Sequence, residues 1–195
     1  MLKSRRSNMS ELDKFPSSFV SEQFETYMEE KDIENLTGSL AHTISQRFEN
    51  EELVVIGLLK GSMMFMSDLL KQIKNVKVTV EFVKLKPLER SKENSGTIII
   101  EKDIQTSVAG KNVLIVTQII DSARSLDFLK RRLTLNNPRC VEILTLFDKP
   151  YNRAVPLKPD YIGKQIEDKF IVGYGNDLDD FGRNIKTLYY LKYPN

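Results

Sequence analysis

The sequence contains a single cysteine and a single histidine, and both scarcities narrow what the protein can be. With one thiol, Cys140, the chain cannot form an internal disulfide, which is the pattern of proteins kept in a reducing cytoplasm. Cys140 opens an apolar segment and is interpreted as a buried structural thiol rather than a nucleophile. His42 has no second histidine or cysteine at the spacing of metal ligands, so it is expected on the surface of a helix. We therefore expect a cytoplasmic protein without a disulfide framework.

Long apolar runs and an excess of charge of one sign are also missing. The apolar runs fall far short of the roughly 20 residues that a membrane-spanning helix needs. The 29 basic and 27 acidic residues give a net charge of +2, which argues against a nucleic-acid binder with a basic face. Residues 1–20 lack the apolar core of a secretory signal and are expected to form a flexible arm, with a partner contact as the alternative. Residues 21–195 suit one domain with a full core.

What the sequence does contain is an alternation of apolar strands and amphipathic helices. Helices are predicted over 21–27, 31–48, 63–73 and 126–135. Strands are predicted over 53–59, 76–83, 97–100, 113–116, 141–147, 169–175 and 187–191, with a short one near Tyr161. The polar segment 84–96 is predicted to be a mobile loop. This order predicts an α/β fold whose doubly wound sheet is mostly parallel and includes an antiparallel hairpin.

The segment 113–125 organises the rest of the chain. An apolar strand, a loop of small residues and a helix follow one another, and this geometry presents unpaired N–H groups and the positive end of the helix dipole to an anion. Ser122 and Ser125 add hydroxyl groups, and Arg124 adds a cation. An ordinary strand–helix turn explains the same pattern equally well. Polar clusters also follow three other strands, and parallel sheets bind ligands at the carboxyl ends of their strands.

Five motifs in a fixed order resemble those of the hypoxanthine-guanine phosphoribosyltransferases, which are type I phosphoribosyltransferases. The motifs are 58–69, 110–121, 146–150, 158–163 and 168–183. The resemblance implies a mostly parallel twisted sheet flanked by helices, with a small hood region from the termini and the C-terminal strands. It also implies transfer of ribose 5-phosphate from phosphoribosyl pyrophosphate to hypoxanthine or guanine, a purine salvage reaction that uses magnesium. A homodimer or homotetramer is the corresponding expectation, with no nucleic-acid or membrane partner.

The resemblance implies a residue for each phosphate group of the substrates. The 5′-phosphate would lie in the loop formed by Asp121, Ser122, Ala123, Arg124 and Ser125. Lys60 and Gly61 would hold pyrophosphate, helped by Arg183. Asp177 would be the magnesium ligand. These assignments agree with the preference of arginine for phosphate oxygens and of magnesium for one carboxylate plus substrate phosphates.

The purine base receives its own set of residues from the resemblance. Asp121 would act as the catalytic acid/base at the purine N7, and Lys149 would donate to O6. Phe170 would stack on the base, and Ile171 would recognise its other edge through backbone groups. Asp177 belongs to this purine-binding set as well.

Three departures from the family pattern bear on activity. The family has a Glu-Asp pair that binds the ribose hydroxyls, and here Thr117-Gln118 takes its place. Ala123 replaces a glycine, which is tolerable if its φ is negative. Pro87-Leu88 replaces the Ser-Tyr pair of the mobile loop. Three interpretations stay open: a transferase with reduced activity, an impaired paralogue that binds purine nucleotide or a protein partner as sensor or scaffold, and a structural subunit with an empty site.

Overall fold

The computed structural model describes residues 24–87 and 97–191, and the chain divides into two compact units. One unit comprises residues 35–168, and the described part of the other comprises residues 24–34 and 169–191. The predicted arm over residues 1–20, together with Leu88 and most of the predicted mobile loop, lies outside the described residues.

The unit 35–168 is built on a six-stranded sheet with the order β4-β3-β2-β5-β6-β7. Its strands are β2 (Glu52–Leu58), β3 (Lys77–Pro87), β4 (Ile98–Lys102), β5 (Asn112–Ile120), β6 (Cys140–Asp148) and β7 (Tyr161–Gln165). β4 runs antiparallel to β3, and every other pair is parallel. The prediction of a mostly parallel sheet with one antiparallel hairpin is confirmed.

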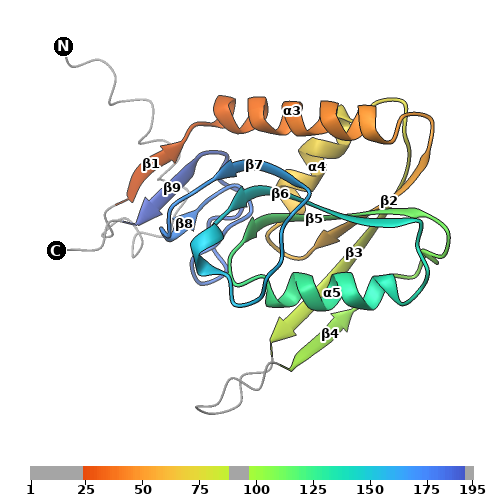
Figure 1. The fold of residues 1–195 in the computed structure, drawn as a ribbon. Helices are drawn as coiled ribbons and strands as arrows, with labels where there is room; N and C mark the ends of the chain where they lie inside the picture. Colours follow the sequence, from red (N-terminus) through yellow and green to blue (C-terminus); the bar gives the residue numbers. More distant parts are fainter. Residues whose placement is uncertain (1–23, 88–96, 192–195) are drawn as a thin grey trace. The chain divides into compact units, whose positions relative to one another are not determined.

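Helices cover both faces of this sheet, as Figure 1 shows. α3 (Glu30–Arg47) and α4 (Met63–Gln72) lie on one face, and α5 (Arg124–Thr134) lies on the other. The apolar residues Leu126, Leu129 and Leu133 recur at three- and four-residue steps, so they form one stripe of α5 that packs on the sheet. Burial of each such side chain contributes about 1.5–3 kcal/mol, which anchors α5 and fixes the loop before it.

β5 is longer than its apolar core predicts. The predicted strand 113–116 extends through Ile120, because β5 lies between two parallel neighbours and continues its pairing with β6 up to Ile120 and Asp148. Thr117 and Gln118 are therefore strand residues. Similarly, Pro87 belongs to β3 and pairs with Ile98 of β4, so residues 84–87 are strand and the prediction of a loop there is wrong.

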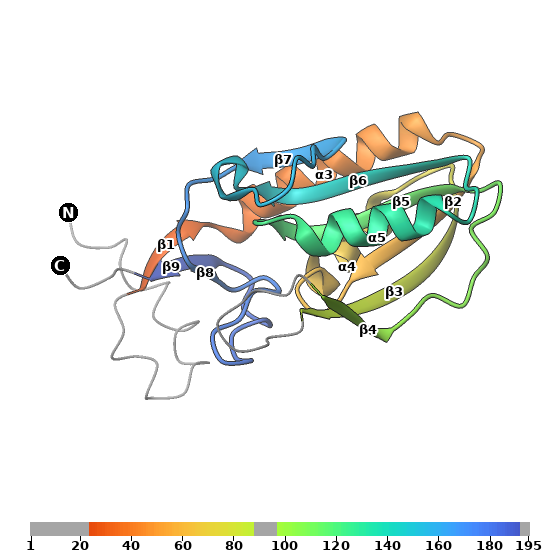
Figure 2. The ribbon, with the colours of Figure 1, turned by 60° about the horizontal axis from the view of Figure 1, so that its bottom comes forward.

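The other unit contains a three-stranded antiparallel sheet with the order β1-β9-β8. β1 (Phe24–Met28), β8 (Ile171–Val172) and β9 (Leu188–Leu191) lie side by side in Figures 1 and 2. This sheet joins an N-terminal strand to two C-terminal strands, as the predicted hood region requires. The predicted helix over 21–27 is wrong from Phe24 onward, because pairing with β9 holds that segment extended.

β8 is shorter than the predicted strand 169–175 because the chain turns at Gly173. Gly173 has a φ of +105°, and a Cβ atom there would lie 2.2 Å from the carbonyl oxygen of Thr187. Only glycine fits this close approach of two backbones. Among the described helices of both units, none combines the length and apolarity needed to cross a bilayer.

Candidate functional site

The loop between β5 and α5 has the strand–loop–helix geometry that the sequence predicts. β5 ends at Ile120 and α5 begins at Arg124, and the side chains of Asp121, Ser122 and Arg124 are exposed. Ser125 is half-buried in the first turn of the helix. Since the first N–H groups of a helix have no partner within it, this end of α5 can bind an anion.

Ala123 occupies the N-cap of α5 in a left-handed conformation, with φ 64° and ψ 1°. The condition under which alanine would be tolerated without strain, a negative φ, is therefore not met. The chain reverses here between strand and helix, and the carbonyl of Ala123 already accepts the N–H of Asp127 at 2.9 Å. A Cβ atom in this conformation costs roughly 1–2 kcal/mol, so alanine is held here under strain.

Arg153, for which the sequence predicts no role, connects the loop to the end of the neighbouring strand. Its Nη1 lies 2.7 Å from the carbonyl oxygen of Asp121 and 3.2 Å from those of Ile120 and Lys149. Its Nη2 forms an ion pair with the carboxylate of Asp148, the last residue of β6. The side chain of Asp148 is 3% exposed and that of Arg153 is 14% exposed, so this is a buried ion pair. The signal in the sequence is an aspartate at the end of an apolar strand, since buried charges need partners.

Lys149 follows Asp148 directly and is itself only 8% exposed. Its Nζ lies 3.2 Å from Oδ1 of Asp168, an exposed carboxylate. The pKa of Asp168 is lowered, first by a hydrogen bond from Asn152 and then by Lys149. The ammonium group is thus held at the carboxyl end of β6 by a carboxylate that water can reach, which leaves the ammonium open to exchange of its partner for a ligand.

A second strand–loop–helix junction lies between β2 and α4. Lys60 is exposed, Gly61 is half-buried, and the peptide bond between Leu59 and Lys60 is cis. Ser62 is 1% exposed, and its hydroxyl donates to the carbonyl of Leu58 at 2.7 Å. Because β2 and β5 are parallel neighbours, this junction and the loop after β5 lie at the same edge of the sheet.

Thr117 and Gln118 are buried within β5, with exposed fractions of 6% and 2%. The Thr117 hydroxyl donates to the carbonyl of Ile119 at 3.3 Å, and the carbonyl of Gln118 accepts the Thr145 hydroxyl at the same distance. Successive strand residues point to opposite faces of a sheet, so the two side chains diverge. A pair of carboxylates at these positions would have to be desolvated.

In the other unit, Phe170 and Ile171 stand at the start of β8. Phe170 is 41% exposed, whereas Ile171 is 6% exposed and pairs with Tyr190 of β9. The carbonyl of Phe170 accepts the N–H of Leu191 at 3.2 Å. The strand pairing thus fixes the backbone and leaves a planar apolar ring at the surface.

The same unit brings Asp177 and Arg183 together. Oδ1 of Asp177 lies 2.6 Å from Nη2 of Arg183, and Oδ2 accepts the N–H of Asp180 at 2.9 Å. Arg183 also donates to the carbonyl of Gly175 at 2.9 Å and lies 3.4 Å from the carboxylate of Asp180. The residues predicted for magnesium and for pyrophosphate therefore neutralise each other. Within residues 24–87 and 97–191, no cluster of three or more His, Cys, Asp or Glu side chains is arranged to hold a metal.

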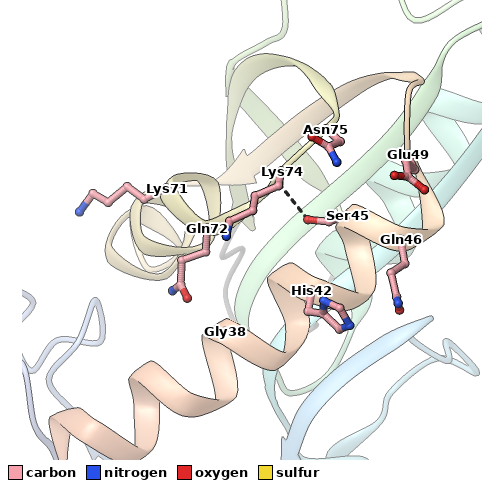
Figure 3. A pocket seen from close by; sticks show the side chains of 9 residues that line it. All are labelled: Gly38, His42, Ser45, Gln46, Glu49, Lys71, Gln72, Lys74 and Asn75. Carbon is pink, nitrogen blue, oxygen red and sulfur yellow. Dashed lines mark hydrogen bonds between the residues drawn. The ribbon is translucent and has the colours of Figure 1, made fainter.

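A hollow of about 560 Å³ between α3 and α4 lies away from these junctions (Figure 3). Gly38, His42, Ser45, Gln46, Glu49, Lys71, Gln72, Lys74 and Asn75 line it. The ends of α3 and α4 lead into the starts of β2 and β3, so the hollow is near the amino ends of the strands. His42 is exposed there, as predicted. Parallel sheets bind ligands at the opposite edge, which favours the loops described above.

Comparison with known proteins links this chain to one family. The pattern of the phosphoribosyl transferase domain matches residues 24–178. A hypoxanthine-guanine phosphoribosyltransferase of Staphylococcus aureus is 34% identical over 168 residues, which are 86% of this chain and 93% of that protein. A crystal structure of a hypoxanthine-guanine phosphoribosyltransferase from Bacillus anthracis is 39% identical with a TM-score of 0.81, covering 86% of this chain and 98% of that one. A hypoxanthine phosphoribosyltransferase structure from S. aureus is 33% identical with a TM-score of 0.85, covering 93% and 100%.

Proposed function

Since the chain belongs to the phosphoribosyl transferase domain family, as a type I member similar to the hypoxanthine-guanine enzymes, we propose that it transfers ribose 5-phosphate from phosphoribosyl pyrophosphate to hypoxanthine or guanine. The bond from ribose C1 to pyrophosphate breaks, and its electron pair leaves with the pyrophosphate oxygen. A bond forms from C1 to N9 of the base, and the base gives up one proton. The products are a purine nucleoside monophosphate and pyrophosphate.

One observation carries this proposal: exposed Asp121 stands in a loop at the N-terminus of α5, and Lys149 stands at the end of the adjacent strand of the same unit. Asp121 is the proposed acid/base at the purine N7. The 5′-phosphate is proposed to bind the loop Asp121–Ser125, where backbone N–H groups, the hydroxyls of Ser122 and Ser125 and the positive end of α5 all favour an anion.

The remaining proposed contacts follow the chemistry of each group. The ammonium of Lys149 suits the carbonyl oxygen O6 and exchanges Asp168 for it. The exposed ring of Phe170 suits the face of a purine, and backbone groups of Ile171 suit its edge. Lys60 and Gly61, at the junction between β2 and α4, are proposed to hold pyrophosphate.

Magnesium is proposed to arrive with phosphoribosyl pyrophosphate. Asp177, which the resemblance also places beside the purine, fits as a single ligand for such an ion, since one of its oxygens is bound only by Arg183. Asp177 would hold the ion, and the guanidinium of Arg183 beside it would suit the pyrophosphate oxygens. A bound magnesium supplies charge neutralisation of the leaving pyrophosphate.

Reduced activity is part of the proposal. Thr117 and Gln118 offer neutral oxygens where the family has carboxylates, and the Thr117 hydroxyl is already engaged with its own backbone. A hydrogen bond to a charged acceptor contributes about 1.5–3 kcal/mol against about 1 for a neutral pair. Weak binding of phosphoribosyl pyrophosphate is therefore expected. The same observation favours a second candidate, a purine-nucleotide sensor whose base and 5′-phosphate contacts are retained.

We also propose that the protein works in the cytoplasm as a homodimer or homotetramer, with residues 21–195 acting as one phosphoribosyltransferase domain. Light scattering of the purified protein tests the assembly, and a monomer at micromolar concentration would contradict it.

The decisive experiment incubates the protein with magnesium, phosphoribosyl pyrophosphate and each purine base in turn. Nucleotide is expected from hypoxanthine and guanine and not from adenine, because the ammonium of Lys149 cannot bond to an amino group that only donates. Asp121→Asn is the inactive control. If wild-type protein forms no nucleotide but inosine or guanosine monophosphate raises its melting temperature, the sensor replaces the enzyme. A ligand at 100 times its Kd adds about 2.7 kcal/mol of stability.

A further inference from the structure

The loop that enters α5 is held by its carbonyl oxygens. Those of Ile120, Asp121 and Ser122 all accept hydrogen bonds from the segment 149–154. The donors are the N–H of Lys149 at 3.0 Å, the guanidinium of Arg153 at 2.7 Å from Asp121 and 3.2 Å from Ile120, and the N–H of Ala154 at 3.0 Å. Three successive carbonyls are thus turned toward one segment.

This orientation determines where the N–H groups of the loop point. In a trans peptide the C=O and the following N–H lie in one plane and point in opposite directions. The carbonyls of residues 120–122 face segment 149–154, so the N–H groups of residues 121–123 face away from it. Successive N–H groups presented together form an anion-binding concavity, which continues here into the first turn of α5.

Arg153 is the only side chain among these donors, and it is fixed from several sides. Besides the loop carbonyls it binds the carboxylate of Asp148, and its Nε donates to the carbonyl of Leu157 at 3.3 Å. A guanidinium presents several donors in one rigid plane, whereas a lysine ammonium is a single point at the end of a flexible stem. Only arginine can satisfy the carboxylate and the carbonyls from one position.

We propose that Arg153 is a positioning residue, which orients the peptide groups of residues 120–123 so that their N–H groups bind a phosphate monoester. Arg153 also binds the backbone carbonyl of Lys149, whereas the ammonium proposed to bind the base is held separately by Asp168. The inference rests on the proposed function for the identity of the ligand. The orientation of the loop is a property of the unit 35–168 alone.

The test compares Arg153→Lys with a matched control. Arg132→Lys changes another arginine–aspartate ion pair, between Arg132 and Asp103, which is partly exposed and lies at the other end of α5 from the loop. Calorimetry with ribose 5-phosphate, inosine monophosphate and free hypoxanthine measures each part of the site separately. Arg153→Lys is expected to lower the affinity for both phosphate ligands about 10-fold or more, because misplacement of binding groups carries a cost of this order. Its affinity for hypoxanthine is expected to fall by less than about 3-fold. Arg132→Lys is expected to leave the affinities for all three ligands unchanged.

A second variant keeps the proposal testable if Arg153→Lys does not fold. Ala154→Pro removes the N–H donated to Ser122 and leaves the buried ion pair in place. Arg153 is extended, with φ −64° and ψ 123°, as a residue before proline prefers. This variant should lower the affinity for ribose 5-phosphate by about 3-fold, as expected for the loss of one neutral hydrogen bond.

The outcomes separate this inference from the proposed function. Wild-type protein that binds ribose 5-phosphate without forming nucleotide would remove the transferase and leave the role of Arg153 in place. Equal affinity of wild type and Arg153→Lys for ribose 5-phosphate would overturn that role even in an active enzyme. An equal loss for all three ligands would also overturn it, because it would show a general structural effect.

Discussion

The loop after β5 and the acidic turn after β8 both carry residues proposed to bind phosphate groups, but they are held in different ways. In the loop 121–125 the carbonyls of Asp121 and Ser122 accept hydrogen bonds from segment 149–154, and the side chains of Asp121, Ser122 and Arg124 are exposed. In the turn 175–183 the proposed cation and anion, Arg183 and Asp177, bind each other. The loop is therefore preformed, whereas the turn must exchange partners when a ligand arrives.

The free energy of the ion pair in the turn decides whether a ligand can displace it. The side chain of Arg183 is 22% exposed and that of Asp177 is 30% exposed, so water screens their attraction. Ion pairs this accessible contribute about 0–1 kcal/mol. Pyrophosphate with its magnesium offers several charge-assisted contacts of about 1.5–3 kcal/mol each. The proposed binding of pyrophosphate therefore favours displacement of this ion pair.

The largest expected effect comes from restoring the carboxylates in the strand that leads into the preformed loop. Thr117→Glu with Gln118→Asp should raise kcat/KM for phosphoribosyl pyrophosphate about 5- to 1,000-fold, from roughly 1–4 kcal/mol of recovered hydrogen bonding. Steady-state kinetics at saturating hypoxanthine measures this gain.

The matched control is Thr117→Gln with Gln118→Asn, which has the same shape without charge and should gain little. Both positions are buried, so the acidic pair should also lower the melting temperature of the free protein. Magnesium with phosphoribosyl pyrophosphate should restore it. An inert acidic variant that still binds inosine monophosphate would count against the enzyme and favour the sensor.

The next effect tests the exchange in the turn. Arg183→Met should lower kcat/KM for phosphoribosyl pyrophosphate about 10- to 100-fold, because charge-assisted contacts to pyrophosphate are lost. Asp180→Asn removes a negative charge 3.4 Å from Arg183 and should raise kcat/KM by about 2-fold. Kinetics at low substrate concentration measures both.

Lys186→Met provides the control within the same unit. Lys186 pairs with Glu30 at the surface, at a distance of 2.6 Å, and has no proposed ligand contact. Its removal should leave kcat/KM unchanged. If Arg183→Met behaves like Lys186→Met, the turn has no part in binding pyrophosphate.

Local pattern was enough to predict the strands of the six-stranded sheet but not β1 of the other unit. The apolar run at 113–116 and the helical period after Leu126 fixed β5 and α5, because both elements bury their own side chains. β1 was missed because Phe24–Met28 is extended only through its partner β9, more than 150 residues later. Such pairing overrides local propensity and leaves no local sign.

The same limit applies to the site. The side chains of the loop 121–125 could be assigned from spacing and resemblance. The sequence shows Asp148 as a buried charge that needs a partner, but not the role of Arg153 in the loop, because that role depends on backbone carbonyls that only the folded chain brings near it. The left-handed conformation of Ala123 was also hidden, since alanine gives no sign of positive φ.

A smaller effect tests how firmly the preformed loop is held. Ala123→Gly should stabilise the protein by about 0.5–1 kcal/mol, because relief of left-handed strain outweighs the extra freedom of glycine in the unfolded chain. For a chain of this size the melting temperature should rise by about 1–4 °C. The reverse change, Gly110→Ala, is the matched control. Gly110 has a φ of +70° and open space around it, so this variant should lose about as much stability as Ala123→Gly gains. A lower melting temperature for Ala123→Gly would mean that the buried methyl group of Ala123 packs well enough to offset the strain of the left-handed backbone.

The smallest effect concerns Lys149, which is proposed to bind the base. The pKa of Asp168 is lowered, first by a hydrogen bond from Asn152 and then by the hydrogen bond and charge of Lys149, so Asn152→Ala and Lys149→Met should each raise it. A carboxyl whose pKa is lower in the folded state stabilises that state above its unfolded pKa of about 3.9, and this stabilisation is lost as pH falls through the folded value. The exposed side chain makes the contribution to stability small, so the titration is followed by the carboxyl NMR shift of Asp168 rather than by unfolding. Binding of hypoxanthine should move the pKa part of the way back toward the ordinary value, because O6 takes over the ammonium of Lys149 while Asn152 stays. If hypoxanthine binds by calorimetry but leaves the pKa of Asp168 unchanged, then Lys149 stays paired with Asp168 and does not bind the base.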